Sequence, residues 1–385
     1  MKENIDEMYM KEAIELAKKG IGFTNPNPLV GAVIVKNGQI IGRGYHKKYG
    51  QLHAEREAIK NSIEEGNAEL MKGACIYVTL EPCCHTGKQP PCTEAIIEAG
   101  FERVVIGSMD PNPLVAGRGV EILKNAGIKV EGPVANKECL ALNKIFFHYI
   151  TKKKPLVTLK VAQTLDGKIA TFSGESKWIT SEKARERVHL DRHKNKAILV
   201  GVATVLKDNP MLNCRNKTLK EVSNPIRIIC DTNLNTPIEA NVVQTAKEQE
   251  TWIFTAIKEE KICDRYKKFG VKIINDSSVI KVEKNGHKAI NLKALVDYLG
   301  ANGIDSLIVE GGGTINFSAL KEKIVDQIQV YIAPKIFGGI EAKTAVEGQG
   351  VEFPKDAFIV DNLELERIGE DILLEGNLKY SDENE

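Results

Sequence analysis

Residues 79–92 read TLEPCCHTGKQPPC and, together with His53-Ala54-Glu55, form the most specific pattern in the chain. The stretch follows a predicted strand over residues 74–79 and leads into a predicted helix over residues 92–100. The N-terminus carries acidic residues throughout and has no apolar signal segment, so we expect the cysteines to stay in a reducing compartment. In that setting a Cys cluster more often indicates a metal site or catalysis than disulfides.

His53, Cys83 and Cys92 are the predicted zinc ligands. Zinc bound by three protein groups keeps a fourth position for water, whose pKa it lowers toward neutrality. Hydrolytic removal of an amino group from a heteroaromatic ring needs such a nucleophile. Glu55 is the predicted catalytic residue, which takes a proton from the water and delivers protons to the ring nitrogen and to the leaving ammonia.

The spacing of the cysteines leaves the ligand set open at this point. Zinc deaminases commonly have two residues between their cysteines, whereas eight lie between Cys83 and Cys92, with Cys84 and His85 as rival ligands. We favour Cys92 because it follows two prolines at a helix start, where the helix dipole stabilises a thiolate. The alternative is a closed structural zinc site in a binding module without catalysis, in which Glu55 has no role.

The segments around this pattern alternate between helices and strands, which predicts an α/β domain over residues 1–150. The charged run 151–155 ends in a proline and is the predicted boundary. Helices are expected over residues 6–19, 53–66, 92–100, 118–126 and 136–150, and strands over 29–35, 39–45, 74–79 and 103–107.

A second α/β domain is predicted for residues 151–385. Residues 159–170 read as strand, turn and strand, and a helix is expected after a Ser181 cap. A Gly-rich turn follows a strand at 306–310 and opens a helix, as in phosphate-binding sites, but the GxGxxG fingerprint of dinucleotide-binding Rossmann domains is absent. The acidic tail 381–385 is expected to be disordered. Further strands are expected over residues 197–200, 226–230, 251–255, 327–333 and 372–375.

Composition excludes several classes of protein. The 385 residues carry a net charge of +1 and only 6% aromatic residues, which disfavours a deaminase that acts on nucleic-acid bases. No apolar run is long enough to span a membrane. We therefore expect a protein that binds neither nucleic acid nor membrane and acts on a small molecule. We also expect it to be cytoplasmic, since it lacks an export signal, and to be a homo-oligomer.

Several motifs together resemble the bifunctional deaminase/reductase family of riboflavin biosynthesis. In the first half they are residues 24–31 (TNPNPLVG), His53-Ala54-Glu55, 79–83 (TLEPC) with 90–92 (PPC), and 110–113 (DPNP) through 116–119 (AGRG). In the second half they are residues 159–170, 174–181, 203–205 (ATV) with 208–210 (DNP), and 309–314 (VEGGGT). The eight-residue cysteine spacing is also that family's own.

This resemblance implies an N-terminal cytidine-deaminase-like three-layer domain and a C-terminal dihydrofolate-reductase-like domain. The first would deaminate 2,5-diamino-6-ribosylamino-4(3H)-pyrimidinone 5′-phosphate with Zn²⁺. The second would reduce the ribosyl side chain with NADPH, giving 5-amino-6-ribitylamino-uracil 5′-phosphate.

The resemblance also implies site residues. The deaminase substrate would contact Asn27, His46, Lys88, Asp110 and Asn112, with Lys88 and His46 placed to pair with the phosphate. NADPH would contact Ala162, Trp178, Thr204, Asp208, Thr232, Gly312, Gly313 and Thr314, in a turn that continues to Ser318. The reductase substrate would contact Lys160, Ser176, Arg192, Leu212, Arg215 and Glu310. Lys160 and Glu310 are our hypothesis for the groups that polarise or protonate the ribose carbonyl or imine.

Overall fold

The computed structural model describes residues 5–113, 115–283 and 285–380. The chain divides into two compact units between Lys153 and Lys154. Each unit has a sheet and a core of its own, and each is described by itself. The acidic tail 381–385, which we expected to be disordered, lies outside the described residues.

The first unit is built on a five-stranded sheet with the order β2-β1-β3-β4-β5. β1 pairs antiparallel with β2 and β3, whereas β3, β4 and β5 are parallel. Four of these strands were predicted, and the three-residue strand β5, none of whose residues is fully buried, was missed. The strands are β1 (Gly31–Lys36), β2 (Gln39–Tyr45), β3 (Cys75–Val78), β4 (Arg103–Ile106) and β5 (Lys129–Glu131).

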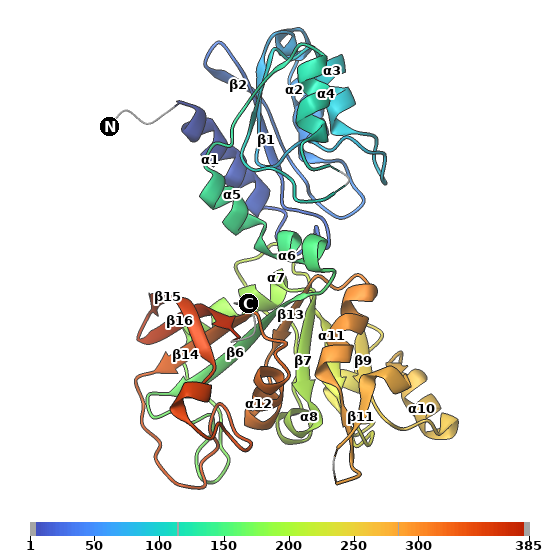
Figure 1. The fold of residues 1–385 in the computed structure, drawn as a ribbon, viewed down its shortest axis with the longest axis vertical. Helices are drawn as coiled ribbons and strands as arrows, with labels where there is room; N and C mark the ends of the chain where they lie inside the picture. Colours follow the sequence, from blue (N-terminus) through green and yellow to red (C-terminus); the bar gives the residue numbers. More distant parts are fainter. Residues whose placement is uncertain (1–4, 114, 284, 381–385) are drawn as a thin grey trace. The chain divides into compact units, whose positions relative to one another are not determined.

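Helices cover both faces of this sheet, α1 and α5 on one and α2, α3 and α4 on the other (Figure 1). Because neighbouring side chains of a strand point to opposite faces, Val33 packs in the cluster of α1 while Ile34 packs in the cluster of α2 and α3. The predicted three-layer architecture is therefore confirmed. The helices are α1 (Ile5–Lys18), α2 (Ala54–Glu64), η1 (Ala68–Met71), α3 (Cys92–Glu98), α4 (Arg118–Asn125), α5 (Asn136–Leu142) and α6 (Lys144–Lys152).

The prediction of one helix over residues 136–150 was wrong, because Asn143 divides it into α5 and α6. Asn143 is buried, and its side-chain amide pairs with the backbone of Leu29. Its Oδ1 accepts from the Leu29 N–H at 2.8 Å, and its Nδ2 donates to the Leu29 carbonyl at 2.9 Å. This pairing joins the turn between the two helices to the segment that carries Asn27.

The second unit contains a nine-stranded sheet with the order β10-β9-β8-β7-β13-β6-β14-β16-β15, and a separate hairpin of β11 and β12. The strands from β10 to β14 are parallel neighbours, and β14, β16 and β15 pair antiparallel. The strands are β6 (Leu156–Thr164), β7 (Ala197–Gly201), β8 (Ile226–Cys230), β9 (Thr251–Phe254), β10 (Lys272–Ile274), β11 (Ile280–Val282), β12 (Lys288–Ile290), β13 (Ser306–Val309), β14 (Gln327–Ala333), β15 (Ile359–Ile368) and β16 (Asp371–Lys379).

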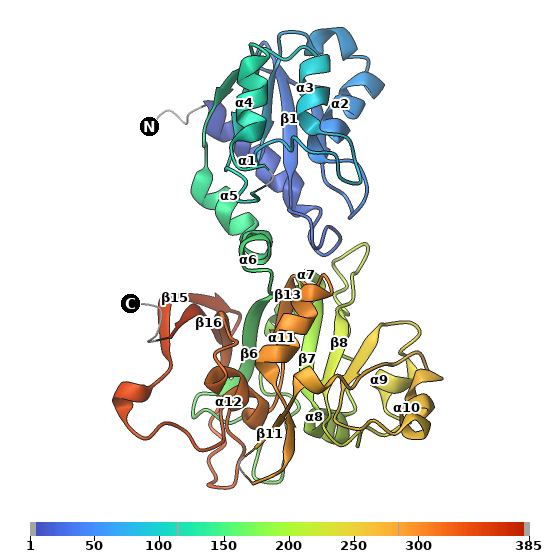
Figure 2. The ribbon, with the colours of Figure 1, turned by 45° about the vertical axis from the view of Figure 1, so that its right-hand side comes forward.

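In the described part of the chain, clusters of buried residues join this sheet to its helices. One contains Leu159, Leu295 and Leu320 and so joins β6 to α11 and α12, and another joins Ile198 and Ile253 to α8, α9 and α10. A smaller one joins Tyr331 of β14 and Leu373 of β16 to α7. Figure 2 shows α11 and α12 in front of the central strands. The helices are α7 (Glu182–Lys194), α8 (Val202–Asp208), α9 (Asn241–Gln244), α10 (Glu260–Lys267), η2 (Ser277–Val279), α11 (Leu292–Ala301), α12 (Gly313–Lys321) and η3 (Pro354–Asp356).

Of the local predictions for this unit, one helix cap is confirmed, one strand is wrong and one strand was missed. Ser181 caps α7 as expected and accepts from the Ala184 N–H. The second strand expected at 168–170 was wrong, since only Lys168 forms an isolated bridge, to Thr344. β15 was missed because it alternates charged and apolar residues that are nearly all exposed, so its pattern does not indicate a buried face.

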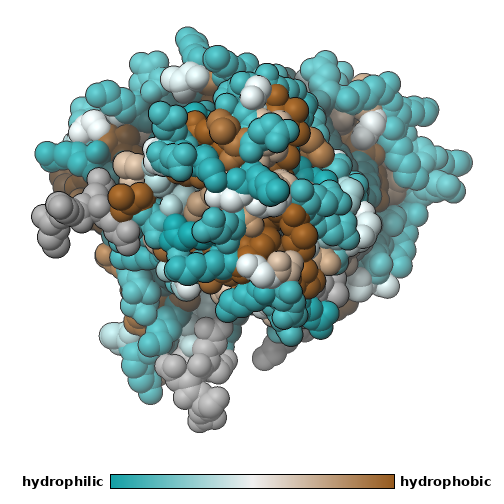
Figure 3. Space-filling model, turned by 90° about the horizontal axis from the view of Figure 1, so that it is seen from above, coloured by the Kyte–Doolittle hydropathy of each residue, from teal (hydrophilic) through white to brown (hydrophobic). Residues whose placement is uncertain are grey.

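Within the described part of the chain, no helix has the length and apolar character needed to cross a bilayer. On the face seen in Figure 3, polar side chains predominate and apolar ones gather in small groups between them.

Candidate active sites

The three predicted zinc ligands lie together in the first unit. His53 precedes α2, Cys83 lies in the loop after β3, and Cys92 begins α3. Nδ1 of His53 is 3.5 Å from Sγ of Cys83 and 3.4 Å from Sγ of Cys92, and all three ligand atoms lie within 4.8 Å of one another. A tetrahedral zinc ion would separate its nitrogen and sulfur ligands by about 3.6 Å. This donor set therefore fits zinc.

Backbone contacts hold the two cysteines against each other. The Cys92 N–H donates to the Cys83 carbonyl at 3.0 Å and approaches Cys83 Sγ at 3.4 Å. The hydrogen bond from Cys92, opposed by burial and assisted by His53, lowers the pKa of Cys83. This direction favours the thiolate, the form that binds metals. Cys84 and His85 do not belong to this group of ligand atoms.

Glu55 lies in the first turn of α2 and is 3% exposed. Burial, followed by the negative charge of Cys83, raises the pKa of its carboxyl group. Glu55, His53 and Cys83 all line one cavity of about 330 Å³. The ligand group thus opens onto a space large enough for a small molecule, which a closed structural zinc site does not need.

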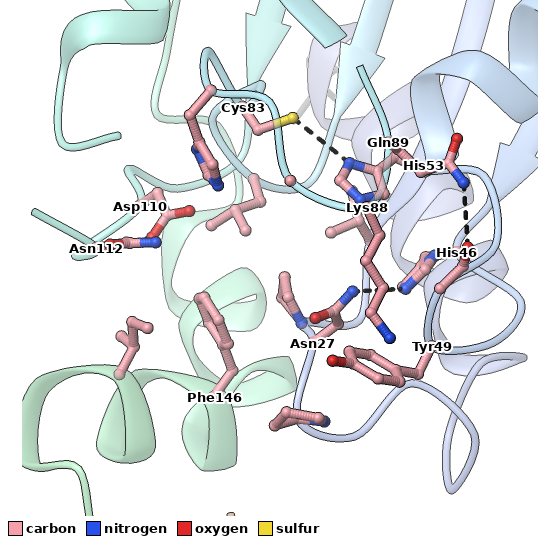
Figure 4. A pocket seen from close by; sticks show the side chains of 18 of the residues that line it. Asn27, His46, Tyr49, His53, Cys83, Lys88, Gln89, Asp110, Asn112 and Phe146 are labelled. Carbon is pink, nitrogen blue, oxygen red and sulfur yellow. Dashed lines mark hydrogen bonds between the residues drawn. The ribbon is translucent and has the colours of Figure 1, made fainter. Parts of the chain in front are cut away.

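All five predicted substrate residues of the first domain line this cavity. Figure 4 shows Asn27, His46 and Lys88 on one side and Asp110 and Asn112 on the other. Hydrogen-bonding groups thus face one another across a gap in front of the zinc ligands.

On the first side, His46 and Asn27 form a hydrogen-bonded pair. Nδ1 of His46 donates to the Leu52 carbonyl at 2.9 Å, and Nε2 accepts from Asn27 Nδ2 at 3.1 Å. Burial lowers the pKa of His46, in agreement with a neutral ring. Lys88 lies 4.1 Å from the centre of the Tyr49 ring and is the cation on this side. Pairing of His46 with a phosphate stays a prediction, which requires Asn27 to turn away.

On the other side, Asp110 organises its own turn. Its Oδ1 accepts from the Asn112 N–H at 2.8 Å. Burial raises the pKa of Asp110 to about 6, although the Asn112 N–H opposes that change.

Sequence reasoning missed the apolar wall of the cavity. Tyr49, Phe146, Tyr149 and Ile150 line it, the last three from α6, and Figure 4 shows Phe146 below the polar groups. Their aromatic character was visible in the sequence, but the side of the helix that faces the cavity was not.

A second cavity of about 310 Å³ lies in the second unit. Leu212, Thr232, Gly313 and Thr314 are outside the residues that line it, and their roles stay predictions. The predicted residues that do line it are Lys160, Ala162, Ser176, Trp178, Arg192, Thr204, Asp208, Arg215, Glu310 and Gly312.

A buried charge cluster forms one wall of this cavity. Nε and Nη2 of Arg192 donate to the two carboxylate oxygens of Glu310 at 2.8 and 2.9 Å, and Lys160 Nζ lies 3.4 Å from Glu310 Oε2. Burial opposes ionisation of Glu310, but the charges of Arg192 and Lys160 outweigh it and lower its pKa to about 2. Glu310 is therefore an anion held between two cations.

Among the lining residues that were not predicted are two basic ones, Arg185 and His189. Arg185 lies 4.4 Å from the Trp178 ring centre and donates to the Thr180 carbonyl at 2.6 Å. His189 accepts from the Arg215 N–H at 3.2 Å. Burial and the neighbouring arginines lower the pKa of His189 to about 4, so its ring is neutral at physiological pH. Arg185, His189 and Arg192 follow one another at intervals of four and three residues along α7, and this helical spacing was the signal that the sequence offered.

Comparisons with known proteins agree with this division of the chain. Residues 3–108 match the family model described as the cytidine and deoxycytidylate deaminase zinc-binding region, and residues 155–374 match the RibD C-terminal domain. The chain is also 51% identical to riboflavin biosynthesis protein RibD of Actinobacillus pleuropneumoniae, over 95% of this chain and 94% of that protein.

The chain belongs to the RibD family. It is thus a bifunctional deaminase and reductase of riboflavin biosynthesis, and the two folds expected from the resemblance, cytidine-deaminase-like and dihydrofolate-reductase-like, are confirmed. The RibD protein of Escherichia coli strain K12 is 40% identical over 96% of this chain and 98% of its own.

Solved RibD structures extend over nearly the whole chain. The diaminohydroxyphosphoribosylaminopyrimidine deaminase/5-amino-6-(5-phosphoribosylamino)uracil reductase of Thermotoga maritima matches with a TM-score of 0.81 and 39% identity, covering 97% of this chain and 99% of that one. RibD of Acinetobacter baumannii matches with a TM-score of 0.85 and 35% identity, covering 98% and 99%.

Proposed function

We propose that residues 1–150 deaminate 2,5-diamino-6-ribosylamino-4(3H)-pyrimidinone 5′-phosphate and that residues 151–385 then reduce its ribosyl side chain with NADPH. The product is 5-amino-6-ribitylamino-uracil 5′-phosphate. The observation that carries the deaminase half is the buried Glu55 carboxylate, which shares a cavity with the His53, Cys83 and Cys92 group.

Deamination replaces the C–N bond to the ring amino group with a C–O bond from water. Zinc held by His53, Cys83 and Cys92 would lower the pKa of that water. Glu55 accepts a proton from the water and passes it to the ring nitrogen, and a second proton transfer lets the amino group leave as ammonia. Asp110 and Asn112 supply acceptors and donors for the pyrimidine edge, Lys88 pairs with the phosphate, and Phe146 packs on the ring.

Reduction adds a hydride from the cofactor to the ribosyl carbon and a proton to the imine nitrogen, so NADP⁺ leaves. Lys160 and Glu310 both lie in the second cavity, but Glu310 is ionised and has no proton to donate. The Lys160 ammonium group is therefore our proposed proton donor, and Glu310 holds it beside the substrate. Arg192 and Arg215 bind the substrate phosphate, and Trp178, Thr204 and Asp208 contact NADPH.

The test follows ammonia release and NADPH absorbance in one cuvette, with the pyrimidinone phosphate as substrate. We expect ammonia first and NADPH loss afterwards. Glu55→Gln should keep its zinc, lose ammonia release by about 10²-fold or more, and still oxidise NADPH when given the deaminated substrate. Ammonia release by Glu55→Gln at the wild-type rate would instead mean that the zinc group is structural.

We also propose that the protein is a cytoplasmic homo-oligomer. All eight cysteines are free thiols, as in reducing compartments. Ile359, Leu363 and Leu365 expose apolar side chains on the edge strand β15, where a second copy would cover them. Light scattering during size-exclusion chromatography measures the number of subunits, and a single-chain mass would refute the assembly.

A further inference from the structure

Glu81 is a buried carboxylate that lines the first cavity and whose side chain is hydrogen-bonded to backbone groups. It is 3% exposed, and its two oxygens accept from four backbone N–H groups of one segment. Oε2 accepts from Gly117 at 3.0 Å and Asp110 at 3.4 Å, and Oε1 accepts from Gly119 at 3.1 Å and Val120 at 3.3 Å. Its own N–H donates to the Ser108 carbonyl at 2.9 Å.

These contacts place Glu81 at the start of α4. The first N–H groups of a helix have no partner within the helix, and a carboxylate there also gains from the helix dipole. Gly117 precedes α4 and has no side chain to cap it. Gly119 allows the close approach, because a Cβ at this position would lie 2.2 Å from the Pro82 carbonyl oxygen. The helix start therefore sits directly on the Glu81-Pro82 backbone.

The segment held in this way carries two of the five candidate substrate residues. Asp110 and Asn112 lie between the ends that Glu81 fixes, and both line the cavity in front of the zinc ligands. Glu81 itself is two residues before Cys83, so one short stretch of chain ties the polar wall to the metal loop.

We propose that Glu81 is a positioning residue, which holds Asp110 and Asn112 where they meet the pyrimidine edge. This inference rests on the proposed deaminase function. Because the two residues bind the ring and take no proton in the reaction, their displacement weakens substrate binding before it slows chemistry.

Glu81→Gln tests this role. The amide keeps the size of the side chain but offers one oxygen and turns an NH₂ group toward N–H donors. Because the variant loses charge-assisted hydrogen bonds, we expect its KM for the pyrimidinone phosphate to be about ten- to 100-fold higher than that of the wild type. We expect its kcat to change less than about threefold. Hydrogen exchange of the amides that donate to Glu81, those of Asp110, Gly117, Gly119 and Val120, should become faster. Zinc content and the NADPH reaction of the second domain should stay at wild-type values.

Glu121→Gln is the matched control, because it makes the same change on the exposed side of α4 and should alter none of these quantities. A wild-type KM and wild-type exchange in Glu81→Gln would overturn the proposal, and so would a loss of zinc that accompanies the KM change. If Glu81→Gln fails to fold, Glu81→Asp keeps the charge but shortens the reach and should raise KM in the same direction. If the wild-type chain released no ammonia, the proposed function would be refuted. The comparison of hydrogen exchange between wild type and Glu81→Gln would still show whether Glu81 holds this segment in place.

Discussion

The charge cluster of the second cavity allows a quantitative prediction. In Glu310→Gln, Arg192 and Lys160 would lose the carboxylate that both contact, at 2.8 and 3.4 Å. The three side chains are at most 14% exposed, so solvent screens the two remaining cations poorly. Removing one partner of a buried ion pair costs about 3–5 kcal/mol of unfolding free energy.

The pKa of Glu310 gives a similar value for this loss of unfolding free energy. It falls from 4.5 to about 2, and each unit corresponds to about 1.4 kcal/mol, which amounts to about 3 kcal/mol in favour of the ionised form. Because the folded pKa is lower than the unfolded one, this stability is fully present above about pH 4.5 and disappears as the pH falls toward 2.

Thermal unfolding of wild type and Glu310→Gln, followed by circular dichroism from pH 3 to 8, measures the effect. We expect the second unit of Glu310→Gln to unfold about 6–12 °C lower at pH 7, with the difference narrowing below pH 4.5. Glu364→Gln on the exposed strand β15 is the control and should match the wild type. A difference below about 1 kcal/mol at pH 7 would refute the reasoning, because it would mean that Arg192 and Lys160 do not depend on the Glu310 charge.

Three further predictions concern the first unit. Lys88→Met should raise the KM for the phosphorylated substrate about ten- to 100-fold and leave the KM for its dephosphorylated form unchanged, in steady-state assays of ammonia release. Cys92→Ser should lose zinc by metal analysis while Cys84→Ser retains it, and equal retention by both would contradict the ligand assignment. Asn143→Ala should lower the unfolding free energy by about 2–4 kcal/mol, because it leaves the partly buried N–H and carbonyl of Leu29 without the Asn143 side chain. Denaturant titration measures this change, and a loss below about 1 kcal/mol would contradict it.

Local signals explain why much of the zinc group was predictable. His53 stands at a helix start, and Cys92 follows two prolines that place it in the first turn of α3. Such signals depend on a few neighbouring residues, so they survive in a sequence without its structure. The same is true of the Ser181 cap of α7 and of the alternating strands and helices that indicated an α/β fold.

Other features were beyond the reach of local patterns. The break between α5 and α6 depends on Asn143 meeting Leu29, 114 residues away in the chain. Glu81 looked like part of a cysteine motif, and only its contacts with the start of α4 showed what it holds. β15 carries so few buried residues that its strand character comes from pairing with β16.

The sequence by itself thus determined the class of each domain, the zinc ligands as a short set of candidates, and the carboxylate beside them. Those predictions rest on residue type, periodicity and spacing, which are properties of a contiguous stretch of chain. The tertiary structure decided which two cysteines lie beside His53 and which side of α6 forms the cavity wall. It also decided that the Glu310 carboxylate lies between the cationic groups of Arg192 and Lys160. These depend on distances between remote segments, and burial and electrostatic interactions follow those distances rather than separation in sequence.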